Sequence, residues 1–233
     1  MKIRVIRSQR RRTIALQVTA AGEVVVRCPQ RTAQADIDRL LRDKRDWLAR
    51  SLAKMRARRS AFLVAGEGEE VLLGAIRKVE TADIVEPEVS AGVLKYPVVW
   101  TEARRLRYKR DLLTRFCERE IPQARADLQR IIQDRVEWPS GAFKLRMMKR
   151  RWGSCARNGD LLFNSRLIEA TPEAIRYVIR HELAHWVHFD HSKAFRALEL
   201  RLVGGAERLG EAKAGLACIS LDGSPTGEAD DLL

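Results

Sequence analysis

All four histidines of the 233-residue chain lie within eleven consecutive residues, 181–191, with the sequence HELAHWVHFDH. His181 and His185 are four residues apart, so on an α-helix their imidazole rings project from successive turns on one face. Two rings placed in this way can bind one zinc ion at Zn–N distances of about 2.0–2.1 Å. Glu182, beside this face, can reach a water molecule on the ion as a general base. The spacing therefore predicts an H-E-x-x-H zinc site.

A catalytic zinc ion needs a third protein ligand and keeps its fourth position for water. His191 follows two residues at which the helix can end, and a chain reversal there would bring its ring back to the ion. His188 shares the helix face but lies about 10 Å along the axis from His181. Glu199 or Glu207 could instead supply a carboxylate ligand. We favour His191 as the third ligand.

The elements around the histidines follow from local signals. Thr171-Pro172-Glu173 predicts a helix start, because it supplies a capping hydroxyl, a proline that needs no N–H partner and a carboxylate near the positive end of the helix dipole. Apolar residues cover most of the helix beyond it, so we expect it to be buried except for one polar seam. Ser192 is expected to cap a second helix, KAFRALELRLV, that stops at Gly204-Gly205.

The N-terminal part of the chain reads as strands and one helix. TIALQVT and EVVVRCP alternate apolar and polar residues and predict a β-hairpin, with Gly22 in its turn. Thr32 is expected to cap a helix that runs to about Met55, with Ile37, Leu40, Leu41, Trp47, Leu48 and Leu52 on one stripe. The segments AFLVAGEGEEVLLGAIRKVE and TADIVEPEVSAGVLKYP predict short strands that form a small antiparallel sheet.

The middle of the chain predicts a long helix over 102–133, in which Pro122 marks a kink or a second start. AFKLRMMKRRWGSC and DLLFN then predict strands joined through the turn ARNG. We expect the fold class to be α+β. The expected divisions are a hairpin, helix and small-sheet module over 1–100, a catalytic core over 101–205 and a C-terminal tail over 206–233, or one continuous domain.

Composition limits the classes of function. The 44 Lys and Arg residues exceed the 31 Asp and Glu residues and give a net charge of +13, which would attract polyanions such as nucleic acid. Solvated arginines on helix faces would explain the same excess. No apolar run approaches the roughly 18 residues of a membrane span, and the four cysteines have no C-x-x-C spacing. We therefore expect a cytoplasmic protein without a membrane partner.

The segment MKRRWGSCARNGDLLFNSRLIEATPEAIRYVIRHELAHWVHFDHSKAF resembles the YgjP-like metallopeptidase family in its WGSC turn, its H-E-L-x-H helix and its later H-S-x-x-F motif. The resemblance implies a zincin-like core, in which the active-site helix packs on a small antiparallel sheet. It also implies that His181, His185 and His191 bind Zn²⁺ and that Glu182 is catalytic. The fold is similar to that of SprT-like and Wss1-like proteases, which act on proteins bound or crosslinked to DNA.

The expected reaction is hydrolysis of a peptide bond in a protein or peptide substrate by a metal-activated water. Tyr177, one turn before the first histidine, is a candidate oxyanion donor, although a core tyrosine is an equal interpretation. Trp152, Ser154 and Asn164 are candidate substrate-binding residues, although they could also be a packing tryptophan and turn formers. The oligomeric state is not predicted.

Two other functions fit the same residues. The chain could be a nucleic-acid-associated binding or adaptor protein in which zinc is structural. It could also be a zinc amidase that acts on a non-peptide amide. Substitution of Glu182 by glutamine separates the first of these from a protease, because only the protease would lose turnover while it keeps its metal.

Overall fold

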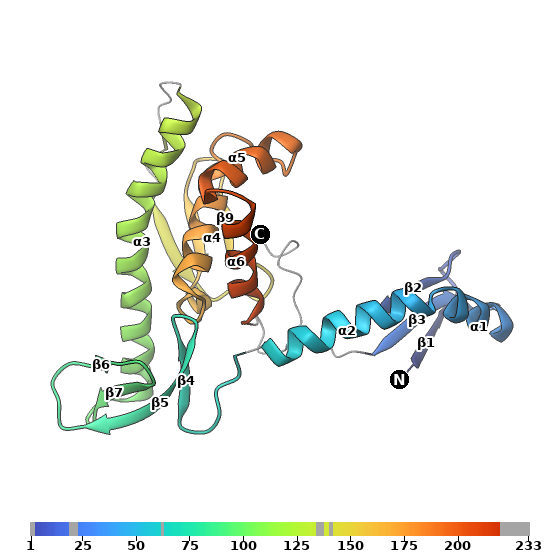
Figure 1. Ribbon diagram of the computed structural model, residues 1–233, viewed down its shortest axis with the longest axis horizontal. Helices are drawn as coiled ribbons and strands as arrows, with labels where there is room; N and C mark the ends of the chain where they lie inside the picture. The colour runs from blue at the N-terminus through green and yellow to red at the C-terminus, as the bar shows by residue number, and fades with distance from the viewer. Residues whose placement is uncertain (1–2, 19–22, 62, 134–137, 140–141, 220–233) are drawn as a thin grey trace. The chain divides into compact units, whose positions relative to one another are not determined.

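The computed structural model describes residues 3–18, 23–61, 63–133, 138–139 and 142–219 (Figure 1). The chain divides into two compact units at residue 62. Unit 1 comprises residues up to 62, and unit 2 begins at residue 63. We describe each unit by itself.

Unit 1 contains a three-stranded sheet with the order β1-β3-β2. β2 (Ala15–Val18) pairs antiparallel with β3 (Val24–Pro29), which confirms the predicted pairing of these two segments. The expected turn residue Gly22 lies outside the described residues. β1 (Ile3–Ser8) pairs parallel with β3, a contact that local patterns did not predict.

Two helices follow this sheet where one was predicted. α1 (Gln34–Asp43) and α2 (Arg45–Ala61) are separated at Lys44. The N-cap is Ala33, without a side-chain hydrogen bond, so the prediction of Thr32 as the cap was wrong. Ile37 packs with Val26 and Cys28 in a small core, and Leu48 is buried, whereas Trp47 from the same predicted stripe is 41% exposed.

Unit 2 begins with a four-stranded sheet of order β4-β5-β7-β6. It comprises β4 (Glu69–Leu72), β5 (Ala75–Ala82), β6 (Glu88–Val89) and β7 (Val93–Pro97). β5 and β7 run parallel and the other two pairs antiparallel, so the prediction of an antiparallel sheet was wrong. The parallel pair arises because the chain between β5 and β7 crosses to the outer edge as β6 before it returns.

α3 (Glu102–Ile132) is a continuous helix of 31 residues (Figure 1). The Thr101 hydroxyl caps it by accepting a hydrogen bond from the backbone N–H of Arg104. The helix runs through Pro122 without a break. Its buried face includes Leu113, Cys117 and Leu128, which anchor it to the core of unit 2.

A second sheet of order β8-β10-β9 precedes the histidine segment. β8 (Phe143–Arg146) pairs parallel with β10 (Leu161–Asn164), whereas β9 (Gly153–Cys155) pairs antiparallel with it. This sheet is therefore also mixed, contrary to the prediction. The expected turn between β9 and β10 is present, with Gly159 at a φ of 85°. A short 3₁₀ helix, η1 (Ser165–Glu169), follows β10.

Three helices complete unit 2: α4 (Pro172–Ala184), α5 (Lys193–Val203) and α6 (Ala206–Ala217). α4 packs against α3, α5 and α6, and it also contacts β9 (Figure 1). The residues expected to begin a C-terminal tail thus form α6, which helps to enclose α4. The backbone N–H of Leu63 donates to the carbonyl oxygen of Cys218 at 2.9 Å, so the start of unit 2 lies beside the end of α6.

The core of unit 2 surrounds α4. Six residues of this helix are nearly inaccessible: Ala174, Ile175, Val178, Ile179, Leu183 and Ala184. Burial of each large aliphatic side chain contributes roughly 1.5–3 kcal/mol, so α4 is held rigidly inside the unit. None of the helices in the described part of the chain has the length and apolar character needed to cross a membrane.

Candidate metal centre

α4 begins and ends at residues that set the direction of the histidines. The Thr171 hydroxyl accepts a hydrogen bond from the backbone N–H of Ala174 at 3.2 Å, and Pro172 occupies the first turn, as predicted. The helix ends at Ala184, so His185 is its C-cap residue. The chain then continues in turns instead of the helix expected as far as residue 188, and this early end leaves room for the chain to reverse.

The structure brings His181, His185 and His191 together. One ring nitrogen of each lies within 4.8 Å of the others, an arrangement that could hold a metal ion. The two Nε2 atoms of His181 and His191 are 3.2 Å apart. Two nitrogens that bind one ion tetrahedrally at about 2.0–2.1 Å lie about 3.3 Å apart, so this spacing fits a shared ion.

Two of these rings are oriented by oxygen atoms that accept a hydrogen bond from their Nδ1 atoms, the ring nitrogens that point away from the cluster. Nδ1 of His181 lies 2.7 Å from Oε1 of Glu199, and Nδ1 of His185 lies 3.0 Å from the carbonyl oxygen of His188. A carbonyl and an ionised carboxylate only accept hydrogen bonds, so each Nδ1 donates and each Nε2 keeps its lone pair. This is the tautomer that a metal ligand needs.

Burial favours the neutral form of His185 and, to a smaller extent, of the more exposed His191. It lowers the pKa of His185 to about 4 and also lowers the pKa of His191, and the neighbouring rings add to both effects. Neutral imidazole is the form that binds metal. At neutral pH, His185 and His191 therefore have lone pairs available without first losing a proton.

Phe195 forms a common packing surface for the three rings. Its centroid lies 4.9 Å from that of His181, 4.7 Å from that of His185 and 4.8 Å from that of His191. It is 1% exposed and is carried by α5, which Ser192 caps through its hydroxyl as predicted. The sequence signal for this role is the phenylalanine of the H-S-x-x-F motif, although the spacing alone did not assign it.

Glu182 lies against the backbone of β9. A Cβ atom on Gly153 would lie 2.7 Å from Cγ of Glu182, so only glycine permits this approach. The Glu182 carboxylate is 1% exposed, and its Oε1 has no hydrogen-bond partner in the described part of the chain. Burial raises the pKa of Glu182 to about 8, against the opposing effect of the positive charge of Arg151.

An unsatisfied buried carboxylate oxygen is unfavourable by several kcal/mol unless a cation or a donor reaches it. Here the oxygen belongs to Glu182, the residue that directly follows His181, one of the three converging histidines. Three imidazoles beside a carboxylate are the donor set of a metal that binds and polarises water. The residues present therefore fit a metal ion.

Glu199 and Tyr177 support the first histidine. The Tyr177 hydroxyl donates to Oε1 of Glu199 at 3.1 Å, and both side chains are buried. Burial opposes ionisation of Glu199, but the hydrogen bond from His181 and the charge of Lys213 outweigh it and lower its pKa. The structure therefore places Glu199 against Nδ1 of His181, and Glu199 does not belong to the group of converging ligand atoms found among the described residues.

The remaining candidate ligands lie apart from the cluster. His188 is half-buried and contributes its carbonyl oxygen to His185. Glu207 is exposed in the first turn of α6. Neither belongs to the group of converging donors found among the described residues.

Trp152 and Asn164 are buried, at 1% and 0% exposure. The amide of Asn164 donates to the carbonyl oxygens of Met148 and Arg151, which holds the segment before β9 in place. Their burial does not support direct contact with a substrate, and both have a structural role instead. Ser154, on β9, is half-buried and follows the glycine that contacts Glu182.

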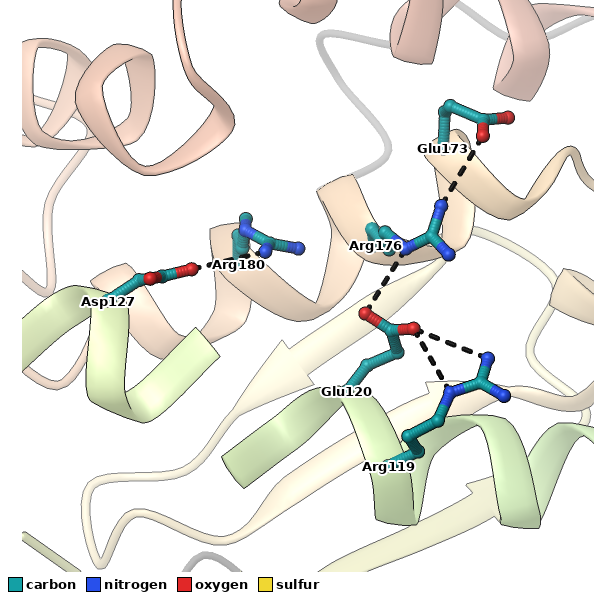
Figure 2. Close-up of polar contacts among 6 residues, drawn as sticks. All are labelled: Arg119, Glu120, Asp127, Glu173, Arg176 and Arg180. Atoms are coloured by element: carbon teal, nitrogen blue, oxygen red, sulfur yellow. Dashed lines mark hydrogen bonds and ion pairs between the residues drawn. The ribbon is translucent and has the colours of Figure 1, made fainter. Parts of the chain in front are cut away.

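Ion pairs fasten α4 to α3 (Figure 2). The buried carboxylate of Glu120 pairs with Arg176 at 3.1 Å and with Arg119 at 3.3 Å, and Asp127 pairs with Arg180 at 3.3 Å. The two arginines of α4 precede the two helix histidines by five residues, which is about 140° around the helix. The face tied to α3 is therefore turned away from the histidines.

A pocket of about 260 Å³ lies between α4 and α6, beside the end of α5. It is lined by Glu173, Arg176, Tyr177, Arg180, Val203, Arg208, Glu211 and Ala212. These residues include neither the clustered histidines nor Glu182. The pocket is therefore separate from the candidate metal centre.

The family comparison agrees with this geometry. The sequence model of the YgjP-like metallopeptidase domain matches residues 12–210, most of the chain. The chain belongs to the YgjP-like metallopeptidase family, which confirms the resemblance seen in the sequence and implies a peptidase that uses a metal ion. No curated protein and no solved structure shows significant similarity to the chain.

Proposed function

We propose that this protein is a zinc-dependent metalloendopeptidase of the H-E-x-x-H type, with zinc held by His181, His185 and His191. The observation that carries the proposal is the convergence of three imidazoles beside a buried carboxylate oxygen that has no partner in the described part of the chain. Three is the number of protein ligands found in catalytic zinc sites, which would also bind a water molecule.

The ion would supply Lewis-acid polarisation of a water molecule and of the substrate carbonyl. Glu182 then acts as the general base: its carboxylate takes one proton from the attacking water. It returns this proton to the amide nitrogen as the C–N bond breaks, so the carboxylate is regenerated and the products are an acid and an amine. A cation near this carboxylate favours its ionised form, which a base needs at neutral pH.

The backbone of β9 provides a second element of the proposed mechanism. β9 is the edge strand of its sheet and contacts Glu182 through Gly153. We propose that an extended substrate pairs with the free edge at Ser154, because edge strands bind peptides through main-chain hydrogen bonds. This contact would place the scissile bond beside the carboxylate.

Tyr177 receives a different role from the one predicted. Its hydroxyl donates to Glu199, and its side chain is buried, so it is not free to stabilise an oxyanion. We propose that it positions Glu199 and, through it, His181. Backbone N–H groups that face the substrate would then serve as oxyanion donors, and a bound ion would supply further stabilisation of the negative charge.

The proposal extends to proteins associated with nucleic acid as substrates, because the chain carries a net charge of +13.

A cytoplasmic location fits the four free cysteines. The alternative of an adaptor with a structural zinc is less well supported, because structural sites are usually closed by four protein ligands. The converging group has three.

Metal analysis and a hydrolysis assay test the proposal. The purified protein should bind one zinc ion and cleave an unfolded protein such as casein. Glu182→Gln should keep the zinc and lose activity by about 10²–10⁴-fold, as expected for loss of a general base. His191→Ala should lose zinc, whereas His188→Ala should retain it. Zinc binding without any hydrolysis by the wild type would favour the adaptor.

A further inference from the structure

The positive charge of the chain is concentrated in unit 1. Residues 1–62 hold 17 of the 44 Lys and Arg residues but only 5 of the 31 Asp and Glu residues, a net charge of +12. Residues 63–233 hold 27 basic and 26 acidic residues, a net charge of +1. The excess of the whole chain is therefore a property of its N-terminal quarter and not of arginine use throughout.

Apart from the half-buried Arg11, the basic side chains described for unit 1 are exposed, and none of them has a carboxylate partner among the residues that the structure describes. The ion pairs found there join residues numbered 70 or higher, and none involves a described Lys or Arg of unit 1. In unit 2, by contrast, arginines such as Arg176 and Arg180 are neutralised by partners on α3. Unpaired exposed cations are the groups that phosphates attract most strongly.

These cations lie on both the sheet and the helices of unit 1. Arg4 on β1 pairs in register with Val25 of β3, two residues before Arg27, so Arg4 and Arg27 share one face of the sheet. Both are exposed, as are Arg10 and Arg12 in the connection from β1 to β2. Exposed guanidinium groups therefore lie on the paired strands β1 and β3 and in the connection from β1 to β2.

The helices add an aromatic side chain between cations. Trp47 is 41% exposed on α2, and the exposed Lys44 and Arg50 lie three residues before and after it. Trp47 and Arg50 are neighbours on the surface of α2 at this spacing, whereas Lys44 lies just before the helix, where its carbonyl oxygen accepts a hydrogen bond from the N–H of Leu48. An exposed tryptophan between cations suits a strand that alternates phosphates with unpaired bases, because bases stack on aromatic rings and phosphates bind lysine and arginine.

We propose that unit 1 is a binding module for single-stranded nucleic acid. Its arginines and lysines contact the phosphate backbone, and Trp47 stacks on a base. The module would hold nucleic acid while the metal centre of unit 2 hydrolyses proteins bound to it. This inference rests on the nucleic-acid part of the proposed function and assigns that binding to unit 1. It is independent of the peptidase chemistry.

The test uses the full chain loaded with zinc and a fluorescein-labelled oligothymidylate of about 20 nucleotides. Binding is followed by fluorescence anisotropy between about 50 and 300 mM NaCl. Two double variants remove cations from unit 1: Arg4→Glu with Arg27→Glu, and Lys44→Glu with Arg50→Glu. The matched control, Arg107→Glu with Arg115→Glu, makes the same change of charge at exposed positions of α3 in unit 2.

Each unit 1 variant should weaken binding at least about tenfold and reduce the steepness of the log–log salt dependence by about 1.4, since each lost phosphate contact removes about 0.7. The control should bind within about twofold of the wild type. Trp47→Ala should weaken binding about fivefold or more, and Trp47→Phe should bind nearly as well as the wild type. Thermal melts check that the variants fold. If the variant with Arg4→Glu and Arg27→Glu does not fold, the variant with Lys44→Glu and Arg50→Glu still tests the inference.

Absence of binding at about 50 mM NaCl would overturn this inference together with the nucleic-acid part of the proposed function. Equal weakening by the unit 2 control would overturn the inference alone, because charge anywhere on the chain would then suffice. Tighter binding to a duplex than to the single strand would also overturn it. Casein hydrolysis without oligonucleotide reports separately on the peptidase and should be unchanged in all these variants.

Discussion

Nδ1 of His181 donates a hydrogen bond to Oε1 of Glu199 at 2.7 Å inside the protein, and the same oxygen accepts a hydrogen bond from Tyr177. The contact joins α4 to α5 and fixes the tautomer of His181. A carboxylate behind a histidine ligand also makes its free nitrogen more basic. Glu199 is thus a positioning residue in the proposed centre.

Glu199→Gln should weaken zinc binding about 10- to 100-fold, because it removes the charge that holds His181. Competition with a chromogenic chelator measures this affinity directly. Glu207→Gln, at an exposed position of α6, is the matched control and should bind zinc as the wild type does. Equal affinities for wild type and Glu199→Gln would show that the contact does not support the metal.

Gly153→Ala should separate metal binding from catalysis. The added methyl group would occupy the space of the Glu182 side chain, so the carboxylate must move away from β9. We expect hydrolysis to fall at least about 100-fold, since a general base out of position loses its contribution. Zinc content should remain at the wild-type level. Gly210→Ala, on an open surface of α6, should keep full activity.

Arg176→Met tests the polar contact between α3 and α4. The change leaves the buried carboxylate of Glu120 with Arg119 as its remaining partner. Removing one partner from a fully buried ion pair lowers the free energy of unfolding by about 3–5 kcal/mol. Because Arg176 is 37% exposed, we expect a smaller decrease of about 1–2 kcal/mol. Urea unfolding measures this free energy. Arg130→Met, at a 77% exposed pair, should change stability by less than about 0.5 kcal/mol.

The buried thiol of Cys117 leads us to expect a loss of stability at alkaline pH. Burial in α3, with nearby Glu118 and Glu120, raises the pKa of this thiol from 9.0 to about 12. The raised pKa means that its contribution is complete below about pH 9 and declines as the pH rises towards 12. Between about pH 8 and 10.5, the decline is about 2 kcal/mol.

Urea unfolding of wild type and Cys117→Ala at both pH values isolates this contribution, since all other titrating groups are shared. The variant should lose about 2 kcal/mol less than the wild type over this interval. A parallel pH dependence of the two proteins would contradict the prediction.

Local signals were sufficient for most of the histidine segment, although not for the early end of α4 at Ala184. The capping residues Thr171 and Ser192 and the stop at Gly204 act within one turn of helix, so the sequence alone predicts α5 and the start of α4. The convergence of the third histidine also follows from short-range geometry, because ten residues separate His191 from His181. A reversal over so few residues leaves little conformational choice.

Long-range packing explains what the sequence did not reveal. The parallel pairing of β1 with β3 depends on contacts between segments more than 20 residues apart. The roles of Glu199 and Phe195 require α5 to fold back on α4, and periodicity on one helix cannot show this. Trp152 and Asn164 were expected near a substrate because they adjoin the WGSC turn, but the core of unit 2 encloses both.

The hydrogen bond from Leu63 to Cys218 closes unit 2 upon itself. The first and last described residues of unit 2 therefore lie side by side, at Leu63 and just after α6. Tension transmitted from a nucleic-acid strand held by residues 1–62 would be applied at this junction and not along the helix that carries His181. A unit closed in this way would keep the spacing of its three histidines when the chain that precedes it is pulled.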